Sequence, residues 1–137
     1  MDMQEFADAL ASKDVNRYGA WFADDMKLFT PIYEEPMIGK ETACQMLPVV
    51  FSVFENFHYP DVLSGETTHA LFFRAEIEGV LLEGVDYIET DASGRVTSFS
   101  VMMRPLKAIT ALTKGIAARM QASGGTPNSA PPTAGQG

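Results

Sequence analysis

The sequence predicts an α+β domain in which N-terminal helices pack on a strongly curved antiparallel sheet, with a last helix after the sheet. Before His58 apolar residues recur mainly at helical spacing, whereas between Thr68 and Arg104 they alternate with period two. Helices that precede a run of strands indicate an α+β domain, since a parallel α/β sheet alternates strands with helices. At 137 residues the chain has the length of one domain with its own core.

The first two helices are indicated by acidic residues in capping positions. Asp2, with Glu5 three residues later, has the form of a capping box, and the apolar residues that follow repeat at helical spacing. Asp14 opens a second helix, whose apolar stripe reaches Phe22. The segment 23–25 should end this helix.

A strand, a third helix and a short strand are expected next. The strand spans Met26 to Ile32 and stops at a turn-like segment. The helix runs from about Lys40 to Phe54 and contains Pro48, which should kink it. The short strand covers His58 to Leu63.

Three long strands follow, separated by two turns that contain glycine. In the middle strand Asp86 lies on the same side as Leu82 and Ile88, which is the apolar side that should face the core. A bare carboxylate there is costly unless it is hydrogen-bonded, protonated or facing a cavity. Asp86 is therefore the leading candidate for a functional residue.

The C-terminal part divides into a helix and a polar tail. Pro105 suits a first helical position, and apolar residues then repeat at helical spacing from Leu106 to Met120. From about Gln121 onward the composition is mostly Gly, Ser, Thr, Pro, Ala and Gln, which buries too little apolar surface to order itself. We therefore expect a domain over residues 1–120 and a disordered tail over residues 121–137.

Composition and charge exclude several classes of partner. The net charge of −8 repels phosphate backbones, so no nucleic acid is expected. No apolar run approaches the roughly 18 residues that a membrane span needs, and the first residues lack the features of a secretory signal. The single cysteine, Cys44, cannot form an internal disulfide, which favours a reducing cytoplasm.

The histidines do not indicate a metal site. His58 and His69 have no Cys, Asp or Glu at metal-binding spacing, and both are expected at strand edges or on the surface. We expect neither a metal nor a cofactor.

Several segments resemble the nuclear transport factor 2-like superfamily. They are Trp21–Pro31, Ile38–Glu41, Gly84–Asp91 and Gly94–Val96, and the resemblance covers roughly residues 3 to 104. The superfamily includes ketosteroid isomerases, SnoaL-like polyketide cyclases and limonene-epoxide hydrolases. The resemblance implies a cone-shaped, cystatin-like α+β roll, a scaffold that hosts unrelated activities.

The resemblance also implies an apolar cavity inside the cone, with Asp86 as its polar group. The side chains expected to line this cavity are Phe6, Thr30, Phe54, Phe73, Ala75, Phe99, Val101 and Met103.

The active-site residues of the enzymatic relatives match only in part. Asp86 matches the protonated aspartic acid of ketosteroid isomerases, which donates a hydrogen bond to the substrate oxygen. Thr30 stands where these enzymes have their aspartate base, and Phe6 where they have a tyrosine donor. Epoxide hydrolases and cyclases have an aspartate on the last strand, whereas the segment 99–103 contains no carboxylate. Isomerisation of a steroid needs the base as well as the donor, so that activity is not expected.

Three functions remain open on the sequence alone. The first is binding of a small apolar molecule in the cone, with Asp86 as its polar contact. The second is an isomerase- or cyclase-type enzyme that acts on a carbonyl-bearing polycyclic or lipid-like substrate, with Asp86 as acid. The third is a dimerisation or interaction module with a collapsed cavity.

The outer face of the sheet is mixed in character, and we expect it to form a homodimer with a second copy, as in many members of the superfamily. Regular strands place Arg74 and Arg104 on the faces away from Asp86, whereas a bulge would reverse this placement. The mixed outer residues are Phe72, Ser98, Ser100 and Met102.

Overall fold

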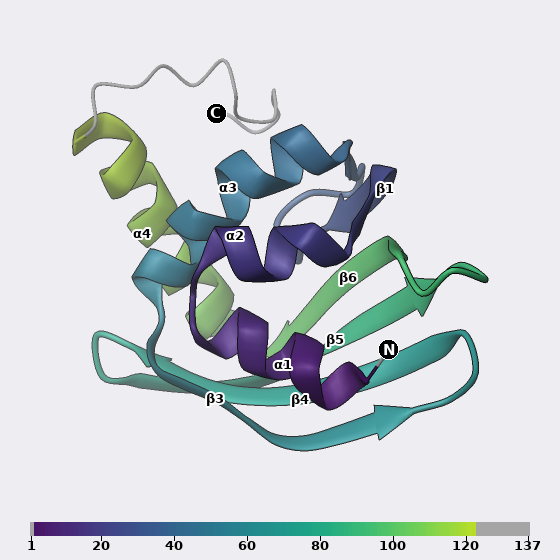
Figure 1. The fold of residues 1–137 in the computed structure, drawn as a ribbon. Helices are drawn as coiled ribbons and strands as arrows, with labels where there is room; N and C mark the ends of the chain where they lie inside the picture. Colours follow the sequence, from purple (N-terminus) through teal and green to yellow (C-terminus); the bar gives the residue numbers. More distant parts are fainter. Residues whose placement is uncertain (1, 123–137) are drawn as a thin grey trace.

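A six-stranded sheet curves around the N-terminal helices in the computed structural model, which describes residues 2–122 (Figure 1). The elements are α1 (Met3–Ala11), α2 (Val15–Tyr18), the 3-10 turn η1 (Gly19–Trp21), β1 (Phe22–Phe29), β2 (Met37–Ile38), α3 (Lys40–Val53), β3 (Glu55–Ser64), β4 (Thr68–Ile77), β5 (Val80–Thr90), β6 (Val96–Arg104) and α4 (Leu106–Ala122). The α+β class predicted from the sequence is confirmed.

The strand order across the sheet is β2-β1-β6-β5-β4-β3. All neighbouring strands are antiparallel except β1 and β6, which run parallel and place Leu28 beside Phe99. The curved sheet that we predicted as antiparallel is therefore mixed, with one parallel pair. Alternation within a strand gives its faces but carries no information about the direction of a strand some seventy residues away.

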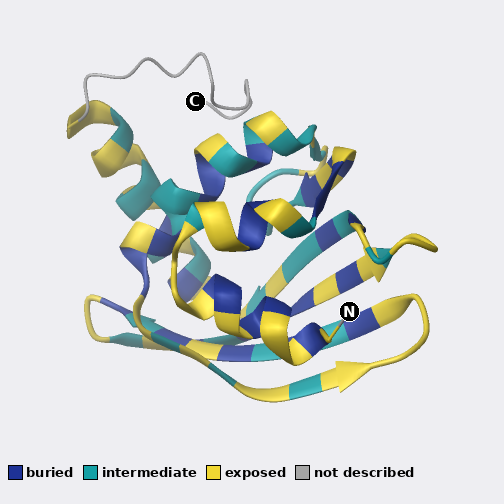
Figure 2. Cartoon of the chain, in the orientation of Figure 1, coloured by how far each residue is buried: buried dark blue, intermediate teal, exposed yellow. Residues whose placement is uncertain are grey.

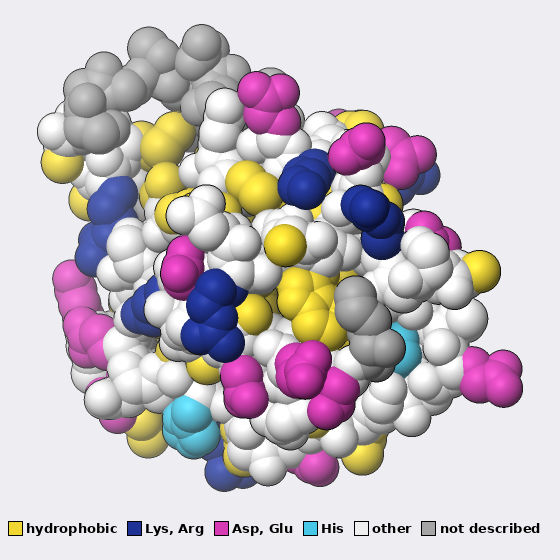
Figure 3. Space-filling view, in the orientation of Figure 1, with side chains coloured by type: hydrophobic (Ala, Val, Ile, Leu, Met, Phe, Trp, Pro, Cys, Tyr) yellow, Lys and Arg dark blue, Asp and Glu magenta, His cyan; other side chains and the backbone are white. Residues whose placement is uncertain are grey.

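The helices cover the concave face of the sheet, and the core lies between the two layers. In Figure 2 buried residues gather where α1 and α3 face the strands. On β4 the alternating residues Leu71, Phe73, Ala75 and Ile77 are buried, as the period-two pattern predicts. Figure 3 shows acidic and basic side chains interspersed on this side of the molecule, with hydrophobic side chains at the centre of the view.

The second helix is shorter than predicted. Asp14 caps α2 by accepting a hydrogen bond from the Asn16 N–H at 3.0 Å, but the helix ends at Tyr18 and β1 begins at Phe22 rather than at Met26. Phe22 stands four residues after Tyr18 and four before Met26, so its position fits a helical stripe and a strand face equally well. The tertiary contacts select the strand.

The edge strand β3 is longer than the predicted segment from His58 to Leu63. It spans Glu55–Ser64, and its register with β4 shifts twice, once before and once after His58. These irregularities break the alternation of faces that a sequence pattern relies on. Pro60 lies within β3, which is consistent with an edge position where one side of the strand lacks a partner.

The C-terminal helix packs on its own domain. Ala108 and Leu112 are buried, and Arg119 donates hydrogen bonds to the Ser52 hydroxyl at 3.0 Å and to the Ser52 carbonyl oxygen at 3.1 Å, at the end of α3. The helix reaches Ala122, two residues beyond the predicted end, and the rest of the predicted tail lies outside the described residues. Between residues 2 and 122 no helix is both long and apolar enough to span a bilayer.

Candidate functional site

Asp86 lies in the middle of β5 on the concave face of the sheet. Its cross-strand neighbours are Leu71 on β4 and Val101 on β6. Only 3% of its surface is exposed, whereas the two aspartates of the 24–25 pair are exposed. The alternation of β5 therefore places a carboxyl group inside the apolar layer, as predicted.

One hydrogen bond from Tyr59 holds the Asp86 carboxyl. The Tyr59 hydroxyl, on the edge strand β3, reaches across β4 and donates to Oδ2 of Asp86 at 2.6 Å. No side chain or backbone group between residues 2 and 122 makes a hydrogen bond to the other oxygen, Oδ1. The carboxyl thus has one committed oxygen and one that is free to meet another group.

Burial controls the protonation of this pair. Desolvation raises the pKa of Asp86 to about 7, although the hydrogen bond from Tyr59 favours the ionised form. Burial, together with the charge and the hydrogen bond of Asp86, holds the pKa of Tyr59 well above its usual range. Near neutral pH Tyr59 is therefore a donor, while Asp86 exists in both charge states.

Aromatic rings surround the polar pair. The Tyr59 ring lies 5.1 Å from the Phe57 ring in an edge-to-face arrangement, and Phe57 stacks on Phe73 with ring centres 5.3 Å apart. Phe54 contacts the same two phenylalanines, at 5.3 and 6.2 Å. Gly84 allows this approach, because a Cβ there would lie 2.5 Å from Cζ of Phe73. The rings keep the carboxyl in an apolar environment.

The other residues that we expected to line a cavity lie in different parts of the domain. Phe6 and Phe99 contact each other at 6.2 Å between ring centres and are fully buried, while Met103 is half-buried against the core. Ala75 is buried but also lines a groove on the other face of the sheet. Thr30 follows β1, and its hydroxyl accepts a hydrogen bond from the Ile32 N–H at 3.4 Å.

Solved structures share this arrangement of helices and strands. A protein with a cystatin-like fold from Silicibacter pomeroyi is 26% identical with a TM-score of 0.84, over 89% of this chain and 86% of that one. A steroid delta-isomerase from Pseudomonas aeruginosa is 27% identical with a TM-score of 0.82, over 88% and 90% of the two chains. An NTF2-like protein from Cytophaga hutchinsonii, of unknown function, is 15% identical with a TM-score of 0.61, over 78% and 90%.

The chain has the fold of the nuclear transport factor 2-like superfamily. Neither a family model nor a curated protein matches the sequence.

Within this fold, Tyr59 is the site residue that the sequence pattern could not place. The sequence shows a tyrosine on a predicted short strand, but the register shifts of β3 decide which face it occupies. The contact with Asp86 joins residues 27 positions apart. The signal available in the sequence was a polar residue on each of the two strands beside β4, Tyr59 on β3 and Asp86 on β5, which can meet across β4 if both face the interior.

His69 is a correction to the sequence prediction. His58 is exposed as expected, whereas His69 is buried, and burial lowers its pKa. The imidazole of His69 lies 2.7 Å from the Ser64 hydroxyl through Nδ1 and 3.1 Å from the Thr90 hydroxyl through Nε2. Both ring nitrogens of His69 have hydrogen-bond partners on neighbouring strands, so burial of the imidazole is tolerated.

In the part of the chain from 2 to 122 no cluster of His, Cys, Asp or Glu could hold a metal ion.

Proposed function

We propose that this nuclear transport factor 2-like domain binds a small, largely apolar molecule in its interior, with Asp86 as the polar contact. The observation that supports this proposal is Oδ1 of Asp86, an oxygen of a buried carboxyl group without a hydrogen-bond partner in the described chain. Among the described residues the fully enclosed side-chain polar atom without a partner is the Tyr18 hydroxyl, whereas Oδ1 of Asp86 is not enclosed in this way. A ligand group can therefore reach Oδ1 and form a hydrogen bond in largely apolar surroundings.

The hydrogen bond from Tyr59 decides where the proton of neutral Asp86 resides. Because Oδ2 accepts from Tyr59, the carboxyl proton belongs on Oδ1. Below the pKa of about 7, Oδ1–H donates to a ketone oxygen of the ligand. Above this pKa the ionised Oδ1 accepts a hydrogen bond and repels a ketone oxygen.

The packing of the interior limits the size of the ligand. Phe54, Phe73 and Phe99 each lie 5 to 6.5 Å from other aromatic rings, so these side chains fill part of the space between the layers. Half-buried Val101 and Met103 border the site, and methionine adapts readily to the shape of an apolar guest. We therefore expect a ligand of one or two rings rather than a large polycycle.

The pH dependence of ketone binding tests this proposal. The fluorescent ketone 2-acetylnaphthalene should bind the wild-type chain at about pH 5.5 and lose at least about tenfold in affinity at about pH 8.5, as Oδ1 loses its proton. In Asp86→Asn the amide donates at both pH values, so this variant should bind the ketone with the same affinity at both.

Two results would contradict the proposal. The first is failure of the wild-type chain to bind the ketone at either pH. The second is a pH dependence in Asp86→Asn that equals that of the wild type. Asp24→Asn, an exposed position on β1, is the matched control and should behave as the wild type does.

An isomerase-type reaction is the second candidate, because a steroid delta-isomerase is among the similar structures. In this function neutral Asp86 would act as the acid toward a carbonyl oxygen. Thr30 stands at the position where the resemblance implies the base, and a hydroxyl cannot move protons at neutral pH. Thr30→Asp should therefore introduce double-bond migration in a β,γ-unsaturated ketone, an activity that the wild-type chain lacks. Absence of this activity in the variant would contradict the isomerase-type function.

A second copy of the chain is the partner that we propose for the outer face of the sheet. Phe72, Val85 and Met102 form one cross-strand row there, and Tyr87 lies in the next row. Met102 is 49% exposed and Tyr87 is 38% exposed. An apolar patch on a two-fold axis can bury itself against its own copy, which suits a homodimer. If the interior binds nothing, dimerisation through this face is the remaining role for the domain.

A further inference from the structure

A groove of about 380 Å³ lies on the outer face of the sheet, on the side away from Asp86. Its polar side chains form a cross-strand row in which Arg74 is the partner of His58 and of Glu83, and Glu83 is the partner of Arg104. Both arginines point away from the interior, so the regular alternation of β4 and β6 is kept at these positions. The groove therefore lies on the opposite face from the Asp86 site, next to the row of Phe72, Val85 and Met102 that we propose as the dimer contact.

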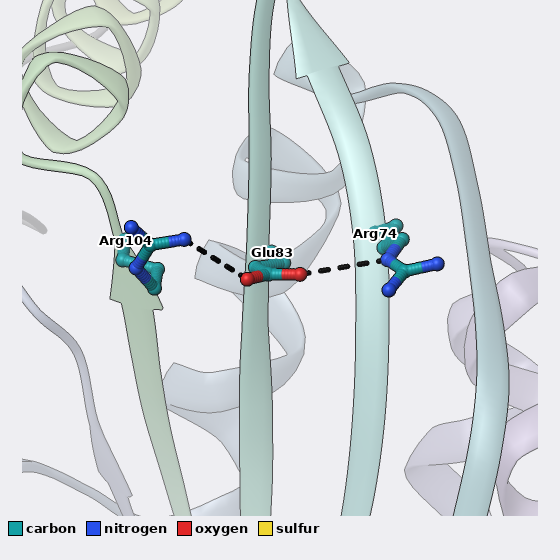
Figure 4. A network of polar contacts seen from close by, with 3 residues as sticks. All are labelled: Arg74, Glu83 and Arg104. Atoms are coloured by element: carbon teal, nitrogen blue, oxygen red, sulfur yellow. Dashed lines mark hydrogen bonds and ion pairs between the residues drawn. The ribbon is translucent and has the colours of Figure 1, made fainter.

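Glu83 engages the two arginines unequally. A terminal nitrogen of Arg104 donates a hydrogen bond to Glu83 at 3.0 Å, whereas Arg74 approaches Glu83 only through Nε, at 3.5 Å (Figure 4). The guanidinium of Arg74 lies 5.4 Å from the centre of the Phe72 ring, a favourable cation–π contact. Among the described residues nothing hydrogen-bonds its two terminal amino groups. Arg74 thus presents a planar pair of donors, the geometry that suits a carboxylate.

Glu76 supplies an uncommitted negative charge next to Arg74. It lies two residues further along the same strand, on the same face, about 6.6 Å away by the rise of a strand. No hydrogen bond or ion pair to another described residue holds it. Glu55 on β3 is its cross-strand partner, and two like charges in these positions are unfavourable. A ligand ammonium placed here would relieve that repulsion.

The groove also has an apolar wall. Leu81 is 70% exposed at its edge, and Pro105 lines it as well. A simple anion would gain from Arg74 but would meet the charge of Glu76. We propose that the groove binds a small zwitterion, a free amino acid with a short branched apolar side chain, whose carboxylate pairs with Arg74 and whose ammonium pairs with Glu76.

Three related molecules test this proposal on the full-length chain. They are L-leucine, 4-methylpentanoate, which lacks the ammonium, and 3-methylbutylamine, which lacks the carboxylate. NMR titration of the backbone amides around the groove, with calorimetry, measures their affinities. L-Leucine should bind at least about tenfold more tightly than either analogue. Absence of saturable shifts, or equal binding of one analogue, would overturn the proposal.

Two substitutions separate the roles of the charged groups. Arg74→Gln should weaken the binding of both L-leucine and 4-methylpentanoate at least about tenfold, whereas Arg17→Gln, an exposed arginine on α2, should change neither. Glu76→Gln should abolish the preference for L-leucine over 4-methylpentanoate. If Glu76→Gln retains the full preference, the ammonium site is wrong.

Discussion

The Asp86 carboxyl links the stability of the domain to pH. Its pKa is about 7 in the folded chain against an ordinary value of 3.8, so between these values the folded chain holds a proton that the unfolded chain releases. The contribution of protonated Asp86 to the free energy of unfolding is fully present below about pH 4. This contribution is lost as the pH rises through 7, where the folded chain also releases the proton. At about 1.4 kcal/mol per pKa unit, the loss is on the order of 4 kcal/mol.

Asp86→Leu removes this titration, so the variant should gain stability relative to the wild type as the pH rises. Urea unfolding at about pH 4 and about pH 8 measures the difference in the free energy of unfolding, which should increase by several kcal/mol. His69 has the opposite effect, because its lowered pKa reduces the free energy of unfolding at low pH. Since the wild type and Asp86→Leu both contain His69, its effect cancels in the difference between them. A difference that stays constant with pH would show that Asp86 titrates normally.

The contact between α3 and α4 depends on Gly115. A Cβ at this position would lie 2.7 Å from Cγ1 of Val53, a buried and stiff side chain. Alanine gains about 1 kcal/mol over glycine in a helix, but crowding of a packed contact costs about 1–3 kcal/mol. We expect Gly115→Ala to lower the midpoint of urea unfolding, despite the better helix propensity.

Val53→Ala provides the control for this contact. In that background the added methyl group has space, so Gly115→Ala should become stabilising by about 1 kcal/mol. If Gly115→Ala stabilises the wild-type chain as well, the close packing of α4 on α3 is not what limits this position.

The outer face of the sheet should determine the state of the whole molecule in solution. The chain has a mass of 14.9 kDa, and light scattering after size exclusion should give twice that value. Met102→Glu places a charge at one end of the apolar row, on a side chain that is 49% exposed, so we expect a monomer. Ile38→Glu adds the same charge on the distant strand β2, where 54% of the side chain is exposed, and should leave the dimer intact. A monomeric wild type, or a dimeric Met102→Glu, would exclude this interface.

Local patterns were sufficient to predict most of the fold. The spacing of apolar residues predicted α1, α3, α4 and the three long strands, because side-chain direction within an element depends only on the local backbone. The same alternation placed Asp86 on the buried side of β5. Phe22 shows the limit of this reasoning, since one residue can satisfy both a helical and a strand pattern.

The amino-acid sequence by itself determined the α+β class and the single carboxyl inside an apolar layer, because both follow from periodicity along the chain. The tertiary structure alone decided that Tyr59 holds this carboxyl, that His69 is buried and that β1 runs parallel to β6. Each of these depends on contacts between segments far apart in sequence. The irregular register of β3 is the physical reason that Tyr59 could not be placed in advance, since a bulge reverses the faces of every residue beyond it.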